Sequence, residues 1–419
     1  MKTHPLVPDQ QPPQLRTGPK PLPLHLAMQT LTWMSALSAL PLWSSGSLSL
    51  KTTKQKSQKN KNLRPVDVDT EALAAAVQRE AFRRLDLFAD GVKEYQNFPP
   101  IKAPDPAPAV WRDGGVRLLD YEQFGESAAN GPPVLVIPSL INRSHILDLA
   151  TDRSLMRHFA GAGFHPYLVD WGTPGKREKK FDLDSYITGP LQNAFDFVQN
   201  QTGSAPALVG YCMGGLLAMA LGQQNLEKTP ALALLATPWD FHSDQGAAAL
   251  HLNAMAPGLK VLIDELGELP VDVLQAMFSG LEPALTGAKF RRFAGLAKDS
   301  PEAARFVALE DWLNDGVPLA GPVARQCLFE WYLENTPAKG TWRVKGQVID
   351  PCQLTLPTFV AIPDRDHIVP PASAQALADT LPSAETLKLA AGHIGMVVGS
   401  AGPERLYKPL TEWLSLHLR

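Results

Sequence analysis

The chain has 419 residues, 45% of them hydrophobic and 19% charged, and a formal net charge of −3 at pH 7. A chain of this length and composition builds a large core, as one α/β domain with an appendage or as two or three domains. Its charge balance argues against nucleic acid as a partner. The three cysteines are widely spaced with no CxxC pair, which argues against a disulfide framework and favours the reducing cytoplasm.

Residues 1–62 are predicted to be a flexible N-terminal region. It begins with a proline-rich stretch and continues with a short amphipathic helix over 24–40. It ends in "KTTKQKSQKNKN" (51–62), whose five lysines and lack of apolar side chains are typical of a solvated linker. Polar residues interrupt the apolar stretch 24–43, so we expect no transmembrane helix there.

This N-terminal helix has three interpretations. It docks on the main domain, or it lies on a lipid-like surface. The third is a signal peptide, although the apolar part begins more than twenty residues after Met1.

A helical extension is predicted for residues 63–110, with Thr70 in the position of an N-cap. From residue 111 to 419, buried strands alternate with helices, which predicts a mostly parallel sheet with helices on both faces. The expected strands lie in "VLVIPSL" (134–140), "YLVDWG" (167–172), "ALVGYC" (207–212), "ALALLATPWDF" (231–241), "TFVAIP" (358–363) and "ETLKLAAGHIG" (385–395). Between about 241 and 346 the sequence is mostly helical, and we expect this insertion to form a cap over the site.

The segment "GYCMGG" (210–215) follows a buried strand and opens a helix. The pattern G-x-nucleophile-x-G at such a junction marks the nucleophile elbow of α/β-hydrolases, where the central residue is usually serine. Here the central residue is Cys212. The sequence therefore predicts an α/β-hydrolase fold with a helical cap insertion and a cysteine nucleophile.

An α/β-hydrolase supplies its catalytic acid and histidine after the nucleophile, in that order. "AIPDRDHIVP" places Asp364 and Asp366 after one strand, and "AAGHIG" places His393 after the next. We interpret His393 as the base that takes the thiol proton and Asp366 as the acid that orients it, with Asp364 as the alternative acid. The N–H of Met213 and one from the "PSLIN" loop are expected to hold the oxyanion.

Other polar residues have simpler interpretations. His367 is expected to support the site or to pack beside it. No partners are arranged around four further residues, which are expected to be structural: His242, His251, Cys327 and Cys352. A metal site built from Asp364, Asp366 and His367 is the competing interpretation, but no further ligands cluster with them. We therefore expect neither a metal nor a cofactor.

A thiol nucleophile favours acyl transfer. Attack of Cys212 on a thioester exchanges one thioester for another, so the acyl group stays activated and can pass to an alcohol. A serine would hold the acyl group as an ordinary, less reactive ester. Cysteine hydrolases also exist, so hydrolysis of hydroxyacyl esters or stored polyester is the second hypothesis.

From about Trp111 to the C-terminus the chain resembles the polyhydroxyalkanoate synthases, especially the short type whose catalytic subunit works with a second subunit. The similarity lies in "VIPSLINRSHILDL", "YLVDWGTPG", "GYCMGG", "TPWDFHSD", "WYLENTPAKGTWRVKGQVIDPCQLTLPTFVAIPDRDHIVP" and "AGHIG". The Tyr-Cys-Met of the cysteine motif departs from the short synthases, in which Gln or Ile more often follows the cysteine.

The resemblance implies that the chain polymerises (R)-3-hydroxyacyl-CoA into polyester with release of CoA. It assigns Cys212 as nucleophile, His393 as base, Asp366 as acid, and Ile141 with Met213 as oxyanion donors. It leaves open whether Asp366 or His393 activates the incoming hydroxyl. It further implies a homodimer, a second synthase subunit as partner, and a cytoplasmic location at polyester granules. A granule-coating protein without activity is the third hypothesis.

Overall fold

The computed structural model describes residues 16–44, 70–243 and 247–418. The chain divides into two compact units. The smaller unit combines residues 1–100 with 282–310, and the larger unit combines residues 101–281 with 311–419. Most of the proline-rich start and the whole of the lysine-rich segment predicted as a linker lie outside the described residues.

An eight-stranded sheet forms the centre of the larger unit as described, in the order β1-β2-β6-β3-β7-β8-β13-β14. Its strands are β1 Ala109–Asp113, β2 Val116–Asp120, β3 Pro133–Ile137, β6 His165–Asp170, β7 Ala207–Tyr211, β8 Leu232–Leu235, β13 Thr358–Pro363 and β14 Ala384–Leu389. From β6 to β14 neighbouring strands are parallel, whereas β2 pairs antiparallel with β6 and β1 pairs antiparallel with β2. The mostly parallel sheet confirms the predicted fold class, while the β1–β2 hairpin is not indicated by the sequence patterns.

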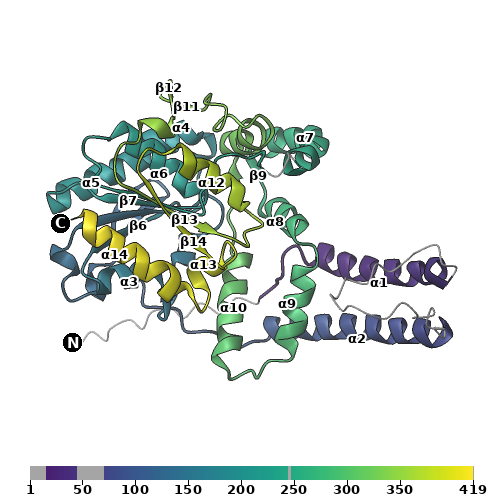
Figure 1. Cartoon of the computed structure of the whole chain (residues 1–419). Coiled ribbons are helices and arrows are strands. Elements are labelled where there is room, and N and C mark those ends of the chain that lie inside the picture. The colour runs from purple at the N-terminus through teal and green to yellow at the C-terminus, as the bar shows by residue number, and fades with distance from the viewer. Residues whose placement is uncertain (1–15, 45–69, 244–246, 419) are drawn as a thin grey trace, which may run out of the picture. The chain divides into compact units, whose positions relative to one another are not determined.

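Helices cover both faces of this sheet. Figure 1 shows α3 (Leu155–Gly161) and α14 (Lys408–His417) on one face, and α5 (Gln192–Thr202) and α6 (Met213–Gln224) on the other. As a result every residue of β3, β6, β7, β8 and β13 is buried. The carboxyl ends of these parallel strands meet along one edge, which is where open α/β sheets place their functional sites.

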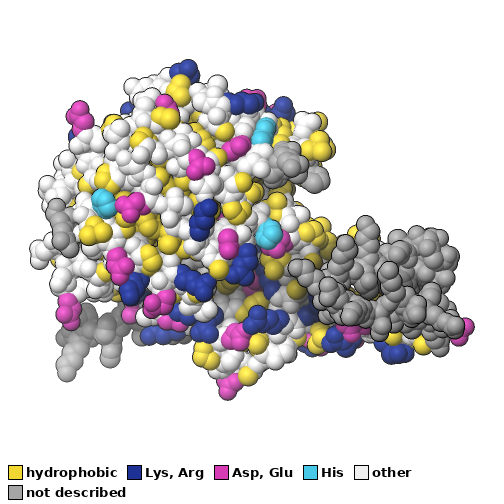
Figure 2. All heavy atoms as spheres, in the orientation of Figure 1, with side chains coloured by type: hydrophobic (Ala, Val, Ile, Leu, Met, Phe, Trp, Pro, Cys, Tyr) yellow, Lys and Arg dark blue, Asp and Glu magenta, His cyan; other side chains and the backbone are white. Residues whose placement is uncertain are grey.

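The surface of the larger unit carries both signs of charge. On the face shown in Figure 2, basic and acidic side chains are interspersed over its elements. This mixture agrees with the small net charge of the whole chain, −3 at pH 7.

The stretch predicted as a cap, residues 241–346, is shared between the two units. In the larger unit it contributes α7 (Ala247–Leu266), α8 (Val271–Leu281), α11 (Gly321–Arg325) and a π-helical segment, Gln326–Leu333. One side of α7 enters the hydrophobic core that also holds the sheet, and its residues recur at helical spacing: Leu252, Ala256, Leu259 and Ile263. These helices of the larger unit therefore pack into its hydrophobic core, and their action as a cap over the site stays a prediction.

The smaller unit contains α1 (Leu22–Ser44), α2 (Thr70–Gln96), α9 (Leu285–Ala294) and the first part of α10 (Pro301–Asn314). Its core is aromatic. The Phe290 ring of α9 meets the rings of Phe88 and Tyr95 of α2 edge-on, with centroids 6.1 and 5.7 Å apart. This packing explains why residues 282–310 belong with the N-terminal helices, although they lie in the middle of the predicted cap.

The first helix differs from the prediction of a short amphipathic segment over 24–40. α1 runs from Leu22 to Ser44, and its apolar side chains are spread around the helix instead of along one face. The hydroxyls of Thr30 and Thr32 donate to main-chain oxygens four residues earlier. Because these hydroxyls are satisfied within the helix, they do not build the polar face that an amphipathic helix needs.

α1 also has partners within the smaller unit. The Trp33 ring lies 5.2 Å from the Phe82 ring of α2, and Arg291 of α9 donates to Gln29 Oε1 at 3.0 Å.

Over the described ranges, no helix is both long enough and apolar enough to cross a membrane.

Candidate active site

Cys212 lies at the sharp turn between β7 and α6, with φ of 56° and ψ of −130°. A non-glycine residue keeps such a strained positive φ only where its surroundings impose it. Glycines allow the chain to approach itself here: a Cβ on Gly210 would lie 2.4 Å from the Gly215 Cα, and one on Gly214 would lie 2.1 Å from the Ile137 carbonyl oxygen. The turn presents the Cys212 side chain at the carboxyl end of β7 and the start of α6.

Asp366 and His393 follow the carboxyl ends of β13 and β14, and the structure brings them together. His393 Nδ1 and Asp366 Oδ2 are 2.6 Å apart in a buried pair. The other carboxylate oxygen, Oδ1, accepts the main-chain N–H groups of Ile368 and Val369, each at 2.8 Å. The acid is therefore held on both oxygens, and the ring it orients keeps Nε2 available for the nucleophile.

The pKa of His393 reflects the proximity of Cys212. Burial lowers the pKa of this imidazole, but the charge of the Cys212 sulfur and hydrogen bonds to Asp366 and Cys212 outweigh burial and raise the pKa to about 10. The ring therefore favours its protonated form beside the Cys212 sulfur. A cysteine next to a histidine that an aspartate orients is the arrangement of a nucleophile activated for acyl transfer.

Tyr211, for which no sequence motif indicates a role, supports the histidine. Its ring lies 5.2 Å from the His393 ring, and its hydroxyl donates to the His393 carbonyl oxygen at 3.2 Å. The only signal for this role in the sequence is its position directly before Cys212.

Asp364 and His367 are close to Asp366 in the chain but, unlike Asp366, they are exposed. Asp364 pairs with Arg365 at 3.5 Å. Since Asp366 is the carboxylate that contacts His393, the geometry favours it over Asp364 as the acid. The competing metal site at these residues has no support, because both oxygens of Asp366 are already used by other donors.

Within the described residues, one group of side chains has the spacing of metal ligands: Asp120, Glu122 and His165. His165 Nε2 is 2.9 Å from Asp120 Oδ1 and 3.6 Å from Glu122 Oε2. His165 begins β6, so the group lies at the amino end of the parallel strands, opposite the edge that carries Cys212. The His165–Asp120 hydrogen bond accounts for the pairing, and catalysis without metal or cofactor stays a prediction.

The two predicted oxyanion donors lie on different segments. Met213 is the first residue of α6, and the first N–H groups of a helix have no partner within it. The Ile141 N–H donates to Ser139 Oγ at 3.0 Å, so a side chain of the same loop occupies this donor. Asn142 follows with φ of 65°, a value that only a few residue types tolerate.

A cavity of about 100 Å³ opens beside Cys212 and His393. Loop 138–143 forms one wall of this cavity. Side chains of α8 and α10, among them Phe278 and Trp312, form another. The apolar part of its lining includes Pro138, Ile141, Phe278, Trp312, Leu313 and Ile394. A small apolar chamber with a nucleophile at its wall fits an acyl group.

The remaining cysteines and histidines differ from the catalytic pair. Burial raises the pKa of Cys327, while desolvation and the Asp350 carboxylate raise that of Cys352. A raised pKa disfavours the thiolate, which leaves Cys212 as the cysteine arranged for nucleophilic attack. The His242 ring bonds to the Tyr332 carbonyl oxygen at 3.0 Å, in keeping with a structural role. The side chain of His251 lies outside the described part of the chain.

Comparisons with known proteins bear on the fold and on the resemblance. The profile of the alpha/beta hydrolase fold family matches residues 132–400. Poly(3-hydroxyalkanoate) polymerase subunit PhaC of Haloferax mediterranei is 30% identical over 314 residues, which cover 74% of this chain and 64% of the relative.

Two further relatives carry the same name. The protein of a Synechocystis species is 29% identical, over 74% of this chain and 84% of its own length. That of Allochromatium vinosum is 28% identical, over 74% of this chain and 88% of its own length. The family match confirms the predicted fold, and the relatives confirm the resemblance noted from the sequence motifs.

Proposed function

This chain belongs to the alpha/beta hydrolase fold family, and we propose that it is a polyhydroxyalkanoate synthase. In this proposal it transfers (R)-3-hydroxyacyl groups from CoA thioesters to a growing polyester and releases CoA. The observation that carries the proposal is a cysteine at the elbow, beside a histidine that pairs with a buried aspartate at 2.6 Å. The names of the relatives support the substrate class.

The first half-reaction acylates the enzyme. The Cys212 thiolate attacks the thioester carbonyl carbon, and a C–S bond forms as the carbonyl π electrons move to oxygen. When the tetrahedral intermediate collapses, the bond to the CoA sulfur breaks, and the His393 imidazolium gives its proton to the leaving thiolate. The products are free CoA and an acyl group on Cys212 in a new thioester.

Acylation changes the histidine. The charge of the Cys212 sulfur is the largest of the causes that raise the pKa of His393. A thioester sulfur carries no charge, so the pKa of the ring falls once the acyl group is in place. His393 has also lost its proton to CoA. It is then neutral and ready to act as a base for the second half-reaction.

The second half-reaction lengthens the polymer. His393 takes the proton from a chain-end or substrate hydroxyl, whose oxygen attacks the Cys212 thioester to form an ester and regenerate the thiolate. We assign this base role to His393 rather than Asp366. Both oxygens of Asp366 accept hydrogen bonds, and its side chain is fully buried.

The oxyanion of both steps needs N–H donors. Met213 N–H at the start of α6 is one, and its helix terminus also favours negative charge. Ile141 N–H is the second, and it becomes available when Ser139 Oγ turns away from it. The loop that carries both Ser139 and Ile141 therefore controls this donor.

One assay separates polymerisation from hydrolysis. The protein is incubated with (R)-3-hydroxybutyryl-CoA while CoA release is followed by thiol titration, and the mixture is then extracted for polyester and for free 3-hydroxybutyrate. A synthase gives CoA and polyester in matching amounts. CoA with free acid in place of polyester would identify a cysteine hydrolase, and no CoA release would favour a non-catalytic granule protein.

The assembly is also a proposal. The relatives are named as polymerase subunits, which supports a second synthase subunit as a partner. We further propose a homodimer that works at the surface of polyester granules in the cytoplasm. Light scattering during gel filtration measures whether the chain is a homodimer. Co-sedimentation with isolated granules measures whether it binds their surface.

A further inference from the structure

Two tryptophans hold the ends of the loop that lines the catalytic cavity. Trp171 Nε1–H donates to the Pro138 carbonyl oxygen at 3.0 Å, and Trp312 Nε1–H donates to the Arg143 carbonyl oxygen at 2.8 Å. We propose that Trp171 and Trp312 are positioning residues that keep loop 138–143 in the conformation needed to stabilise the oxyanion. The inference builds on the acyl transfer proposed for Cys212.

These two hydrogen bonds are not a general consequence of burying tryptophan. Among the described residues, Nε1 of Trp331 and Nε1 of Trp342 are buried without a hydrogen-bond partner. Both rings lie in the same core as Trp171. The fold therefore tolerates unpaired indole N–H groups elsewhere, whereas the two tryptophans at this loop are aimed at its main-chain oxygens.

The loop is also held at its middle. Asn142 turns the chain there with φ of 65°, in the left-handed region that asparagine tolerates better than most residues. Gln275 of α8 donates to Asn142 Oδ1 at 3.3 Å and to the Leu313 carbonyl oxygen at 3.0 Å. The middle of the loop is thus tied to the same segment that carries Trp312.

The loop also touches the elbow directly. An added Cβ on Gly214 would lie 2.6 Å from the Pro138 carbonyl oxygen, and this is the oxygen that Trp171 binds. The start of α6 and the start of the loop are therefore in main-chain contact. A shift of Pro138 would change the spacing between the Ile141 N–H and the Met213 N–H, the two proposed oxyanion donors.

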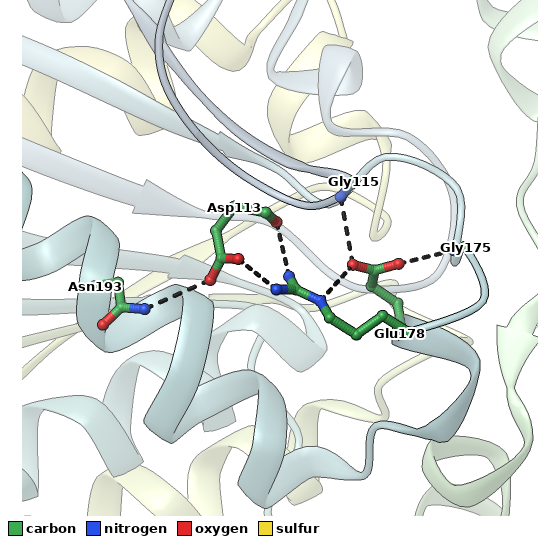
Figure 3. Close-up of polar contacts among 6 residues, drawn as sticks. Asp113, Gly115, Gly175, Glu178 and Asn193 are labelled. Carbon is green, nitrogen blue, oxygen red and sulfur yellow. Dashed lines mark hydrogen bonds and ion pairs between the residues drawn. The ribbon is translucent and has the colours of Figure 1, made fainter.

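Trp171 is itself rigidly placed. Its ring meets the Tyr186 ring edge-on, with centroids 5.6 Å apart. Further along the same segment, the carboxylate of Glu178 accepts the N–H groups of Gly175 at 3.0 Å and Gly115 at 3.3 Å, as Figure 3 shows. The neighbouring guanidinium of Arg177 donates to Asp113 Oδ1 at 2.6 Å.

These hydrogen bonds join the β1–β2 turn to the segment that follows β6. Trp171 is the first residue of that segment, so the network helps to fix the position of the ring that binds Pro138. Trp312 acts from the opposite end of the loop. There the Arg143 side chain also pairs with Asp315 at 2.9 Å. The loop is therefore held from the sheet at one end and from the cap segment at the other.

The test separates oxyanion stabilisation from thiolate formation. Trp171→Phe and Trp312→Phe each keep an aromatic ring and remove the N–H. Acylation of Cys212 by (R)-3-hydroxybutyryl-CoA needs the oxyanion site, whereas alkylation by iodoacetamide needs only the thiolate. We expect each variant to acylate between about tenfold and 10²-fold more slowly, as small misplacements in active sites do. The pH profile of alkylation should stay unchanged in both variants, and KM should stay unchanged in Trp171→Phe, because Trp171 does not line the cavity.

Trp342→Phe is the matched control, because it makes the same truncation in a buried ring that has no hydrogen bond to lose. It should acylate and alkylate at the wild-type rates. Wild-type acylation in both loop variants would overturn the proposal, as would alkylation that falls in parallel with acylation.

p-Nitrophenyl acetate serves as a second acyl donor that needs the oxyanion site but no recognition of CoA. If the wild type reacts with this ester and not with the CoA thioester, the proposed function is wrong. The rates of the two loop variants with the ester then decide the positioning role separately.

Discussion

Asp366 Oδ2 lies 2.6 Å from His393 Nδ1, while Asp364, two residues earlier in the same loop, is exposed and faces Arg365. Two neighbouring aspartates with the same side chain therefore occupy different environments. The Asp366 carboxylate bonds to the buried His393 ring, whereas the Asp364 carboxylate pairs with the exposed Arg365 guanidinium. This difference makes the pair a direct test of the catalytic assignment.

Replacing Asp366 with Asn should slow acylation by a factor of about 10² to 10⁴, because the amide can neither orient the ring in the same tautomer nor stabilise its charge. The measurement is CoA release in single-turnover experiments with (R)-3-hydroxybutyryl-CoA. Asp364→Asn is the matched control and should stay close to the wild-type rate, since a surface pair contributes little. A larger loss in Asp364→Asn would reverse the assignment.

Cys212→Ala should abolish CoA release while the protein stays folded by circular dichroism, because it removes the nucleophile. Cys212→Ser should lose most of the activity, since a hydroxyl is a poorer nucleophile and forms a less reactive ester. Cys352→Ser is the control: this exposed cysteine has a raised pKa and should be replaceable without loss. Radiolabelled acyl groups found on Cys327 or Cys352 of the wild type would contradict the assignment.

The protonation of His393 should depend on the sulfur of Cys212. The folded-state pKa of the ring is about 10, against about 6.5 for an exposed histidine, so the ring stays charged as pH rises from 7 to 9. In Cys212→Ala the largest raising cause is gone while burial still lowers the pKa, so the midpoint must fall. NMR of the ring nitrogens against pH measures both midpoints. Equal midpoints in the two proteins would rule out the thiolate–imidazolium pair.

The order of the catalytic parts could be predicted from the sequence because each lies next to a strong local pattern. "GYCMGG" marks the elbow at Cys212, and the strand before Asp366 is a continuous apolar run. The strand before His393 mixes apolar with polar residues, but "AAGHIG" follows it directly. Parallel strands of this kind end at one edge of the sheet, so residues far apart in the chain must meet there. The 2.6 Å contact between Asp366 and His393 is the result.

Other features have no local pattern from which they could be predicted. α9 packs on α2 through Phe290, and apolar periodicity tells which face of a helix is buried but not which helix covers it. In the contacts of Trp171 and Trp312 with loop 138–143, a side chain donates to a main-chain oxygen. Every residue has a main-chain oxygen, so the sequence does not indicate which of them is bonded. The same holds for the Tyr211–His393 hydrogen bond.

The small cavity beside Cys212 should favour short acyl groups. Its volume is about 100 Å³, and at roughly 10 to 15 Å³ for each water molecule that such a cavity holds, it has room for about seven to ten water-sized groups. A four-carbon 3-hydroxyacyl group therefore fits more easily than an eight-carbon one. We expect kcat/KM to be at least about tenfold higher for 3-hydroxybutyryl-CoA than for 3-hydroxyoctanoyl-CoA, because a factor of ten needs only about 1.4 kcal/mol.

Phe278→Ala should narrow this difference, because Phe278 forms part of the cavity wall. Met277→Ala is its control. Met277 lies on the same helix, α8, and packs against the hydrophobic core. A preference that is equal in the wild type and Phe278→Ala would show that another surface selects the chain length.

The exposed apolar side chains of α1 should contribute to granule binding. Leu31 is 62% exposed and Met34 is 52% exposed, on a helix whose partners in the smaller unit leave these side chains facing solvent. A polyester surface is apolar, and burying one such side chain against it is worth about 1.5 to 3 kcal/mol when burial is complete. Replacing both Leu31 and Met34 with Gln should therefore weaken co-sedimentation with granules by about tenfold or more, while acylation of Cys212 continues at the wild-type rate.

The control carries Leu250→Gln and Leu416→Gln, two leucines that are 72% and 67% exposed in the larger unit. It removes a comparable exposed apolar area outside α1, so a general loss of surface hydrophobicity would affect both double variants equally. Binding that weakens only in the α1 variant would identify α1 as a granule contact. Equal binding of the α1 variant and the wild type would mean that α1 serves the packing of the smaller unit alone, as its contacts with Phe82 and Arg291 already allow.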